Sequence, residues 1–187
     1  MKEKAVIVSA PSGAGKSTIV AHLIKSIPEL EFSVSACSRQ IRPGEVDGKD
    51  YHFIPVEQFR EHIEKCDFLE WEEVYPGSFY GTLKSEIRRI WSLHKFPIFD
   101  VDVKGALSLK RYFRSNGLSI FIQPPSIEVL RSRLGSRGTE SPESLKKRFD
   151  KAEYELTFSE KFDRMLINDQ LEKACSEATE LVKNFIR

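Results

Sequence analysis

The stretch SAPSGAGKST, residues 9–18, decides the fold of this chain. It follows an apolar run at residues 5–8 that is typical of a buried strand, and apolar residues return after it at helical spacing. A strand, a glycine-rich turn, a lysine and a helix in this order are typical of a phosphate-binding loop, in which backbone N–H groups converge on an anion. The candidate nucleotide-binding residues are Ala10, Pro11, Ser12, Gly13, Ala14, Gly15, Lys16, Ser17 and Thr18.

Two side chains of this loop carry chemistry of their own. Lys16 supplies a mobile positive charge for the outer phosphates, and the Ser17 hydroxyl is a suitable ligand for Mg²⁺. The strict motif has glycine where this chain has Ala10, so we expect Ala10 to keep an ordinary negative φ. The alternative is a serine- and glycine-rich turn that merely precedes a lysine, but the flanking strand and helix favour a nucleotide site.

Composition excludes several classes of protein. The chain has 187 residues, 40% of them hydrophobic and 30% charged, which suits one domain with small inserted lobes. A net charge of +1 predicts no general attraction to nucleic acid or to anionic membranes. The three cysteines have no disulfide or metal spacing and favour a reducing compartment, and no apolar run reaches membrane-spanning length. We therefore expect a cytoplasmic protein.

Strands and helices alternate along the chain, which predicts a parallel sheet covered by helices on both faces. Short strands are expected at residues 32–37 and 162–167, and a buried strand is expected at residues 96–102. We assign residues 1–32 and 83–187 to a core domain and residues 33–82 to a strand-rich insertion.

Polar side chains follow the predicted core strands. Ligands bind beyond the carboxyl ends of such strands, where the phosphate loop, Asp100, Asp102 and Asn168 are expected to meet. Alternation along the strand predicts that Asp100 and Asp102 share one side. They are either solvated strand-end acids or groups that hold metal-bound waters or orient a basic partner, and their position favours the second interpretation.

The insertion carries groups for a second ligand. Arg39, Arg42 and Tyr51 suit another phosphate, since guanidinium groups bind oxyanions in a bidentate way. Glu70, Tyr80 and Thr82 are expected on the other edge of the same insertion. A carboxylate there accepts hydrogen bonds from the N1–H and amino group of guanine. Adenine offers an acceptor at N1 and would be disfavoured.

These motifs resemble the guanylate kinase family from about residue 4 to residue 182. The resemblance rests on SVSACSRQIRPGEVDGKDYHF at residues 33–53, FLEW at 68–71, YGT at 80–82, DVD at 100–102, RGTE at 137–140 and ND at 168–169. It implies an α/β fold of the P-loop NTP hydrolase type, with a GMP-binding insertion at 33–82 and a lid at about 135–155. It also implies Mg²⁺-dependent transfer of the ATP γ-phosphoryl group to GMP, giving ADP and GDP.

The resemblance assigns roles residue by residue. It places ATP on residues 10–18 and Asn168, and Mg²⁺ on Ser17, with Asp100 acting through water. The guanine readers would be Ser35, Glu70 and Thr82, the GMP phosphate would be held by Arg39, Arg42, Tyr51 and Tyr80, and Asp100 and Asp102 complete the GMP-binding set. The catalytic candidates are Lys16, Arg39, Arg137 and Arg148.

Two alternatives remain at this point. One is a catalytically inactive guanylate-kinase-like module that binds a protein partner, and the other is a kinase for a different nucleoside monophosphate. The expected partners are ATP and GMP, with no nucleic acid and no membrane. Acceptance of dGMP and the choice between monomer and homodimer stay open.

Overall fold

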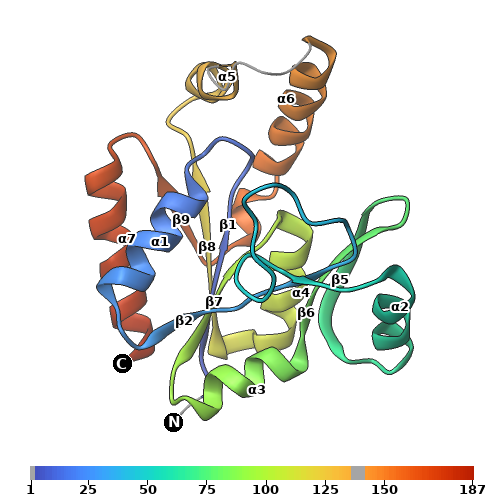
Figure 1. Cartoon of the computed structure of the whole chain (residues 1–187). Helices are drawn as coiled ribbons and strands as arrows, with labels where there is room; N and C mark the ends of the chain where they lie inside the picture. The colour runs from blue at the N-terminus through green and yellow to red at the C-terminus, as the bar shows by residue number, and fades with distance from the viewer. Residues whose placement is uncertain (1–2, 136–141) are drawn as a thin grey trace.

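A computed structural model describes residues 3–135 and 142–187. Its centre is a five-stranded sheet in the order β2-β7-β1-β8-β9, in which every neighbouring pair is parallel (Figure 1). The prediction of a parallel sheet core is therefore confirmed. The strands are β1 (Ala5–Ser9), β2 (Leu30–Phe32), β7 (Phe96–Asp100), β8 (Gly117–Gln123) and β9 (Arg164–Ile167).

Helices cover both faces of this sheet (Figure 1). Because side chains alternate along a strand, Val6 and Val8 of β1 pack on one face while Ala5 and Ile7 pack on the other. The first face is covered by α1 (Lys16–Ser26) and α7 (Leu171–Ile186), and the second by α3 (Lys84–Ser92) and α4 (Val103–Phe113). With both faces covered, ligands reach the sheet only at the ends of its strands.

A second, four-stranded sheet lies beside the first, in the order β4-β3-β6-β5. It consists of β3 (Ala36–Cys37), β4 (His52–Phe53), β5 (Phe68–Tyr75) and β6 (Ser78–Leu83), and it packs against α2 (Val56–Glu64). The packing is aromatic: the Phe59 ring stacks on Phe68 and Phe79 with centroids 4.4 and 5.4 Å apart. This small core holds the hairpin of β5 and β6 rigidly next to α4.

The strand predicted at residues 32–37 is wrong as a single element. β2 ends at Phe32 in the first sheet, and β3 begins at Ala36 in the second. The chain crosses between the sheets at residues 33–35, where the backbone N–H of Ser33 donates to Ile98 O and that of Val34 donates to the Glu86 carboxylate. The last strand likewise begins at Arg164 rather than at residue 162.

Two helices stand above the strand ends, α5 (Ile127–Gly135) and α6 (Pro142–Leu156), and they pack together through an apolar cluster that includes Leu130, Leu134 and Ala152 (Figure 1). Short 3-10 turns, η1 (Arg114–Asn116) and η2 (Ser159–Lys161), complete the elements. None of the described helices is both long and apolar enough to cross a membrane.

Candidate functional site

The phosphate loop connects β1 to α1 in a conformation that requires glycine. Gly13 and Gly15 have φ angles of 87° and 91°, in the left-handed region, and Gly15 precedes the first turn of α1. A Cβ on Gly15 would lie 2.4 Å from the Asn168 side-chain nitrogen, so the loop also needs glycine for space. Ala10 is not among the residues with positive φ, as predicted from its sequence position.

Asp100, at the end of β7, binds both functional side chains of the loop. Its Oδ1 lies 2.7 Å from Lys16 Nζ, and its Oδ2 accepts a hydrogen bond from the Ser17 hydroxyl at 3.1 Å. Lys16 also donates to the carbonyl oxygen of Val101 at 2.8 Å. The lysine therefore lies at the strand ends with its charge paired to Asp100, and an anion bound by the loop would compete with this carboxylate for it.

Asp102 differs from its prediction. β7 ends at Asp100, so the two acids do not lie on one side of a single strand; instead Asp102 is the N-cap of α4 and accepts the backbone N–H of Gly105 at 2.9 Å. A cap of this kind satisfies an otherwise unpaired helical N–H group. Both acids nevertheless line the cavities at the site.

Two cavities open over the strand ends and share one wall. The first, of about 510 Å³, surrounds the phosphate loop, and the second, of about 530 Å³, extends to the second sheet. The residues that line both are Ser12, Lys16, Asp100, Asp102 and Lys151. The phosphate loop and the insertion therefore face one another across a continuous space of a size suited to small-molecule ligands.

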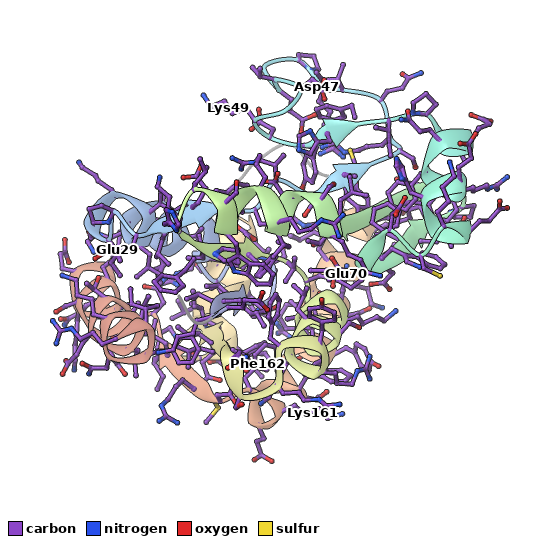
Figure 2. The ribbon with its side chains drawn as sticks, turned by 90° about the horizontal axis from the view of Figure 1, so that it is seen from below. Glu29, Asp47, Lys49, Glu70, Lys161 and Phe162 are labelled. Atoms are coloured by element: carbon purple, nitrogen blue, oxygen red, sulfur yellow. The ribbon has the colours of Figure 1, made fainter. Side chains whose placement is uncertain are left out.

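The far end of the second cavity carries the predicted base-reading residues. Glu70 pairs with Thr82 in the antiparallel register, and the Thr82 hydroxyl donates to Glu70 Oε1 at 2.7 Å. On the other side of β6, Ala36 pairs with Gly81, so Ser35, the residue before β3, lies next to Thr82 and lines the second cavity. Figure 2 shows Glu70 next to α4, and Gly105 of that helix leaves room for its carboxylate.

The carboxyl group of Glu70 is a weaker acid than an ordinary glutamate. Burial raises the pKa of its carboxyl to about 7, and the Thr82 hydrogen bond opposes this shift only in part. The negative charges of Asp102 and Glu72 raise the pKa further. Ionisation of this buried carboxyl group is unfavourable, and a ligand that donates hydrogen bonds to the carboxylate would stabilise the ionised form.

The predicted phosphate-binding residues divide into two groups. Arg42, Tyr51 and Tyr80 line the second cavity. Arg39 does not line it: its guanidinium binds the Glu45 carboxylate at 2.6 and 2.7 Å and donates to the Tyr80 hydroxyl at 3.0 Å. In this structure Arg39 therefore positions Tyr80, and Glu45 occupies most of the guanidinium fork.

Helix α6 contributes cationic and acidic groups to the first cavity. The Arg148 guanidinium donates to the Ser12 hydroxyl at 2.9 Å, which brings this predicted catalytic residue to the phosphate loop. Lys151 and Glu155 of the same helix line the cavity too. Arg137, the other predicted lid arginine, lies outside the described residues, as does most of the segment before α6.

Asn168 contacts the phosphate loop directly. Its side-chain amide is buried and donates to the carbonyl oxygen of Ala14 at 2.7 Å, and its own backbone carbonyl accepts from Arg133 at 3.0 Å. Asn168, which the family resemblance assigns to ATP, thus holds the phosphate loop in this structure. Its place at the exit of β9 was the only signal in the sequence for this role.

The charged residues Glu45, Lys151 and Glu155 of the site were not predicted from the sequence. Glu45 could have been found from its spacing, since it follows Arg42 by three residues in a turn and accepts the backbone N–H of Arg42 at 2.8 Å. Hydrogen bonds from Arg39 lower the pKa of Glu45 to about 2. Lys151 and Glu155 had no distinguishing pattern, because the helix that carries them has many charges.

Comparison with known proteins agrees with this geometry. The model of the family "Guanylate kinase" matches residues 2–185. The guanylate kinase of Bacteroides thetaiotaomicron is 48% identical over all of this chain and 91% of its own length, and that of Porphyromonas gingivalis is 48% identical over 98% of both chains. The crystal structure of guanylate kinase from Anaplasma phagocytophilum matches with a TM-score of 0.77 and 26% identity, covering 97% of this chain and 85% of that one. The chain belongs to the guanylate kinase family.

Proposed function

We propose that this protein is a guanylate kinase, which transfers the γ-phosphoryl group of ATP to GMP and yields ADP and GDP. The observation that carries the proposal is that Glu70, with its Thr82 donor, faces the Lys16 side of the phosphate loop across adjoining cavities. The cavity at the phosphate loop suits a triphosphate, and the Glu70 end of the second cavity suits a base with two adjacent hydrogen-bond donors. In this arrangement the two reacting phosphates meet between them.

Recognition of guanine depends on the direction of the hydrogen bonds at Glu70. In its ionised form the carboxylate only accepts, and the Watson–Crick edge of guanine presents the N1–H and the amino group side by side. Adenine would place its N1 lone pair against the carboxylate, which would then keep only the hydrogen bond that Thr82 donates to it. Ser35, on the other side of Thr82, is placed to bind the same base.

The phosphates of the two nucleotides need neutralisation by cations. We assign the ATP phosphates to Lys16 and the loop N–H groups, and the GMP phosphate to Arg42, Tyr51 and Tyr80, with Arg39 acting through Tyr80 and by direct contact if Glu45 releases it. Arg148 then neutralises the migrating phosphoryl group. Positioning and charge stabilisation are the main contributions of a protein to phosphoryl transfer.

The Ser17 hydroxyl would bind Mg²⁺, with the Asp100 carboxylate acting through water; these two groups lie 3.1 Å apart at the mouth of the loop. Hard oxygen donors of this kind fit Mg²⁺, which keeps several waters and binds substrate phosphates as well. When bound, the ion would shield the charge on the β- and γ-phosphates.

We further propose a division of labour within the chain. Residues 33–82 hold GMP, residues 1–32 and 83–187 form the ATP-binding core, and residues 135–155 act as a lid that carries Arg137 and Arg148. Closure of the insertion and lid would exclude water, which otherwise competes with GMP for the phosphoryl group. The inactive-module alternative is disfavoured because Lys16, Ser17 and Arg148 all meet at the phosphate loop.

A panel of nucleoside monophosphates with Mg-ATP as the donor tests the substrate assignment. We expect GMP to be phosphorylated with a kcat/KM at least about 100-fold above that for AMP, CMP or UMP, because only guanine satisfies Glu70. Glu70→Gln should fold normally and lose most of this discrimination. Equal rates with all four nucleotides, or no transfer to GMP, would contradict the proposal.

Replacement of the loop lysine tests the role of its charge. Lys16→Ala should lower kcat by about 10²- to 10⁵-fold, because the transferred phosphoryl group loses a cation that stabilises its developing charge. Lys25→Ala, which removes an exposed lysine of the same helix, is the matched control and should retain wild-type turnover. A turnover near that of the wild type in Lys16→Ala would refute the assignment.

The acidity of Glu70 predicts a pH dependence. Only the ionised Glu70 carboxylate accepts both guanine hydrogens, and the pKa of this group is about 7. The value of kcat/KM for GMP should therefore fall as the pH drops from 8 to 6. The fall approaches about tenfold per pH unit below the pKa. The phosphate of GMP also titrates near pH 6. The measurement is therefore the ratio of kcat/KM for GMP in the wild type to kcat/KM in Glu70→Gln, because the titration of GMP cancels in this ratio. A ratio independent of pH would show that Glu70 does not titrate in this range.

A further inference from the structure

Glu72 lines the second cavity, and its charge raises the pKa of Glu70. It stands two residues after Glu70 on β5, so both side chains are on the same face of the second sheet. In the register of the hairpin Glu72 pairs with Tyr80, as Glu70 pairs with Thr82. These four side chains occupy the corners of a rectangle on the face that looks toward the phosphate loop.

Three corners of this rectangle already have a partner in the proposed complex. Glu70 and Thr82 form the corner pair that binds the guanine edge, and Tyr80 lies beside Tyr51, with ring centroids 5.8 Å apart, where the GMP phosphate is assigned. Neighbouring positions on one face lie about 5–7 Å apart along and across the strands. The ribose joins the base to the phosphate, so it must pass close to the fourth corner.

The two oxygens of Glu72 have different surroundings. Oε1 accepts from Lys104 of α4 at 2.6 Å. Oε2 is buried, and in residues 3–135 and 142–187 no donor hydrogen-bonds to it. A buried carboxylate oxygen without a donor is unfavourable and calls for an explanation.

Lys104 thus binds one oxygen of the Glu72 carboxylate, and the other oxygen, Oε2, has no hydrogen-bond donor among the described residues. Lys104 is 69% exposed, so this ion pair adds little to stability on its own. Ribose carries hydroxyl donors at C2′ and C3′, on the edge of the sugar that bears neither the base nor the phosphate. We propose that Glu72 accepts a hydrogen bond from a ribose hydroxyl of GMP and so distinguishes GMP from its deoxy analogues.

This inference rests on the proposed function and can fail separately from it. The experiment measures kcat/KM for GMP, 2′-deoxy-GMP and 3′-deoxy-GMP with saturating Mg-ATP; the two deoxy compounds identify which hydroxyl is bound. A hydrogen bond to a charged acceptor predicts that the wild type prefers GMP over one of them by about 10- to 100-fold. The difference should appear mainly in KM, because the sugar is remote from the reacting phosphates.

Variants on both sides of the ion pair separate recognition from structure. Glu72→Ala should lower kcat/KM for GMP to the value for the disfavoured deoxy compound and leave that value unchanged. Glu72→Gln keeps the shape of the side chain and one neutral acceptor, so it should retain a preference of a few-fold for GMP over the disfavoured deoxy nucleotide. If Glu72→Ala does not fold, Glu72→Gln provides the test. Lys104→Met breaks the same ion pair from the other side and should keep the wild-type preference.

The overturning results are distinct. Three results would each show that Glu72 is only a structural partner of Lys104. The wild type could have the same kcat/KM for GMP and both deoxy nucleotides, or Glu72→Ala could lower kcat/KM by the same factor for all three. The third such result is a Lys104→Met variant with the same nucleotide preference as Glu72→Ala. Absence of any transfer to GMP by the wild type would instead refute the proposed function.

Discussion

The site depends on one carboxylate at the end of a central strand. Asp100 binds Lys16 at 2.7 Å and Ser17 at 3.1 Å, and it can do so because β7 and β1 are hydrogen-bonded neighbours with Asp100 paired to Val8. The lysine and the acid are each about one-fifth exposed, so this ion pair is only partly screened by water. It keeps the cation of the loop close to the two oxygens that we propose for Mg²⁺ binding.

The phosphate loop itself is held from two sides. Asn168, at the exit of β9, donates to Ala14 O, and Arg148 of α6 donates to the Ser12 hydroxyl. The positive φ angles of Gly13 and Gly15 would be costly for other residues but are readily adopted by glycine, and the two side-chain contacts hold the loop in this conformation. Preorganisation of this kind lets backbone N–H groups meet an anion without first rearranging, which is the source of their electrostatic effect.

Much of this could be predicted from local sequence, and the exceptions have physical reasons. Apolar runs and glycine spacing are local signals, and they predict the phosphate loop and the parallel sheet. The negative φ of Ala10 follows from the side chain of alanine itself. The roles of Asp102 and Asn168 depend on partners elsewhere: whether Asp102 ends a strand or caps α4 depends on where β7 stops, and Asn168 meets the loop only after β9 pairs with β8. The alignment of Glu70, Thr82 and Ser35 likewise depends on strand register, which local patterns leave undetermined.

The central claim is that one end of the site reads guanine while the other holds a triphosphate. The most direct measurement is a crystal structure with GMP and a non-hydrolysable ATP analogue in the presence of Mg²⁺. We expect the guanine N1 and amino nitrogen within about 3 Å of the Glu70 carboxylate, as hydrogen bonds require, and the γ-phosphate in contact with Lys16. A guanine bound away from Glu70, or a triphosphate bound away from the phosphate loop, would contradict the account.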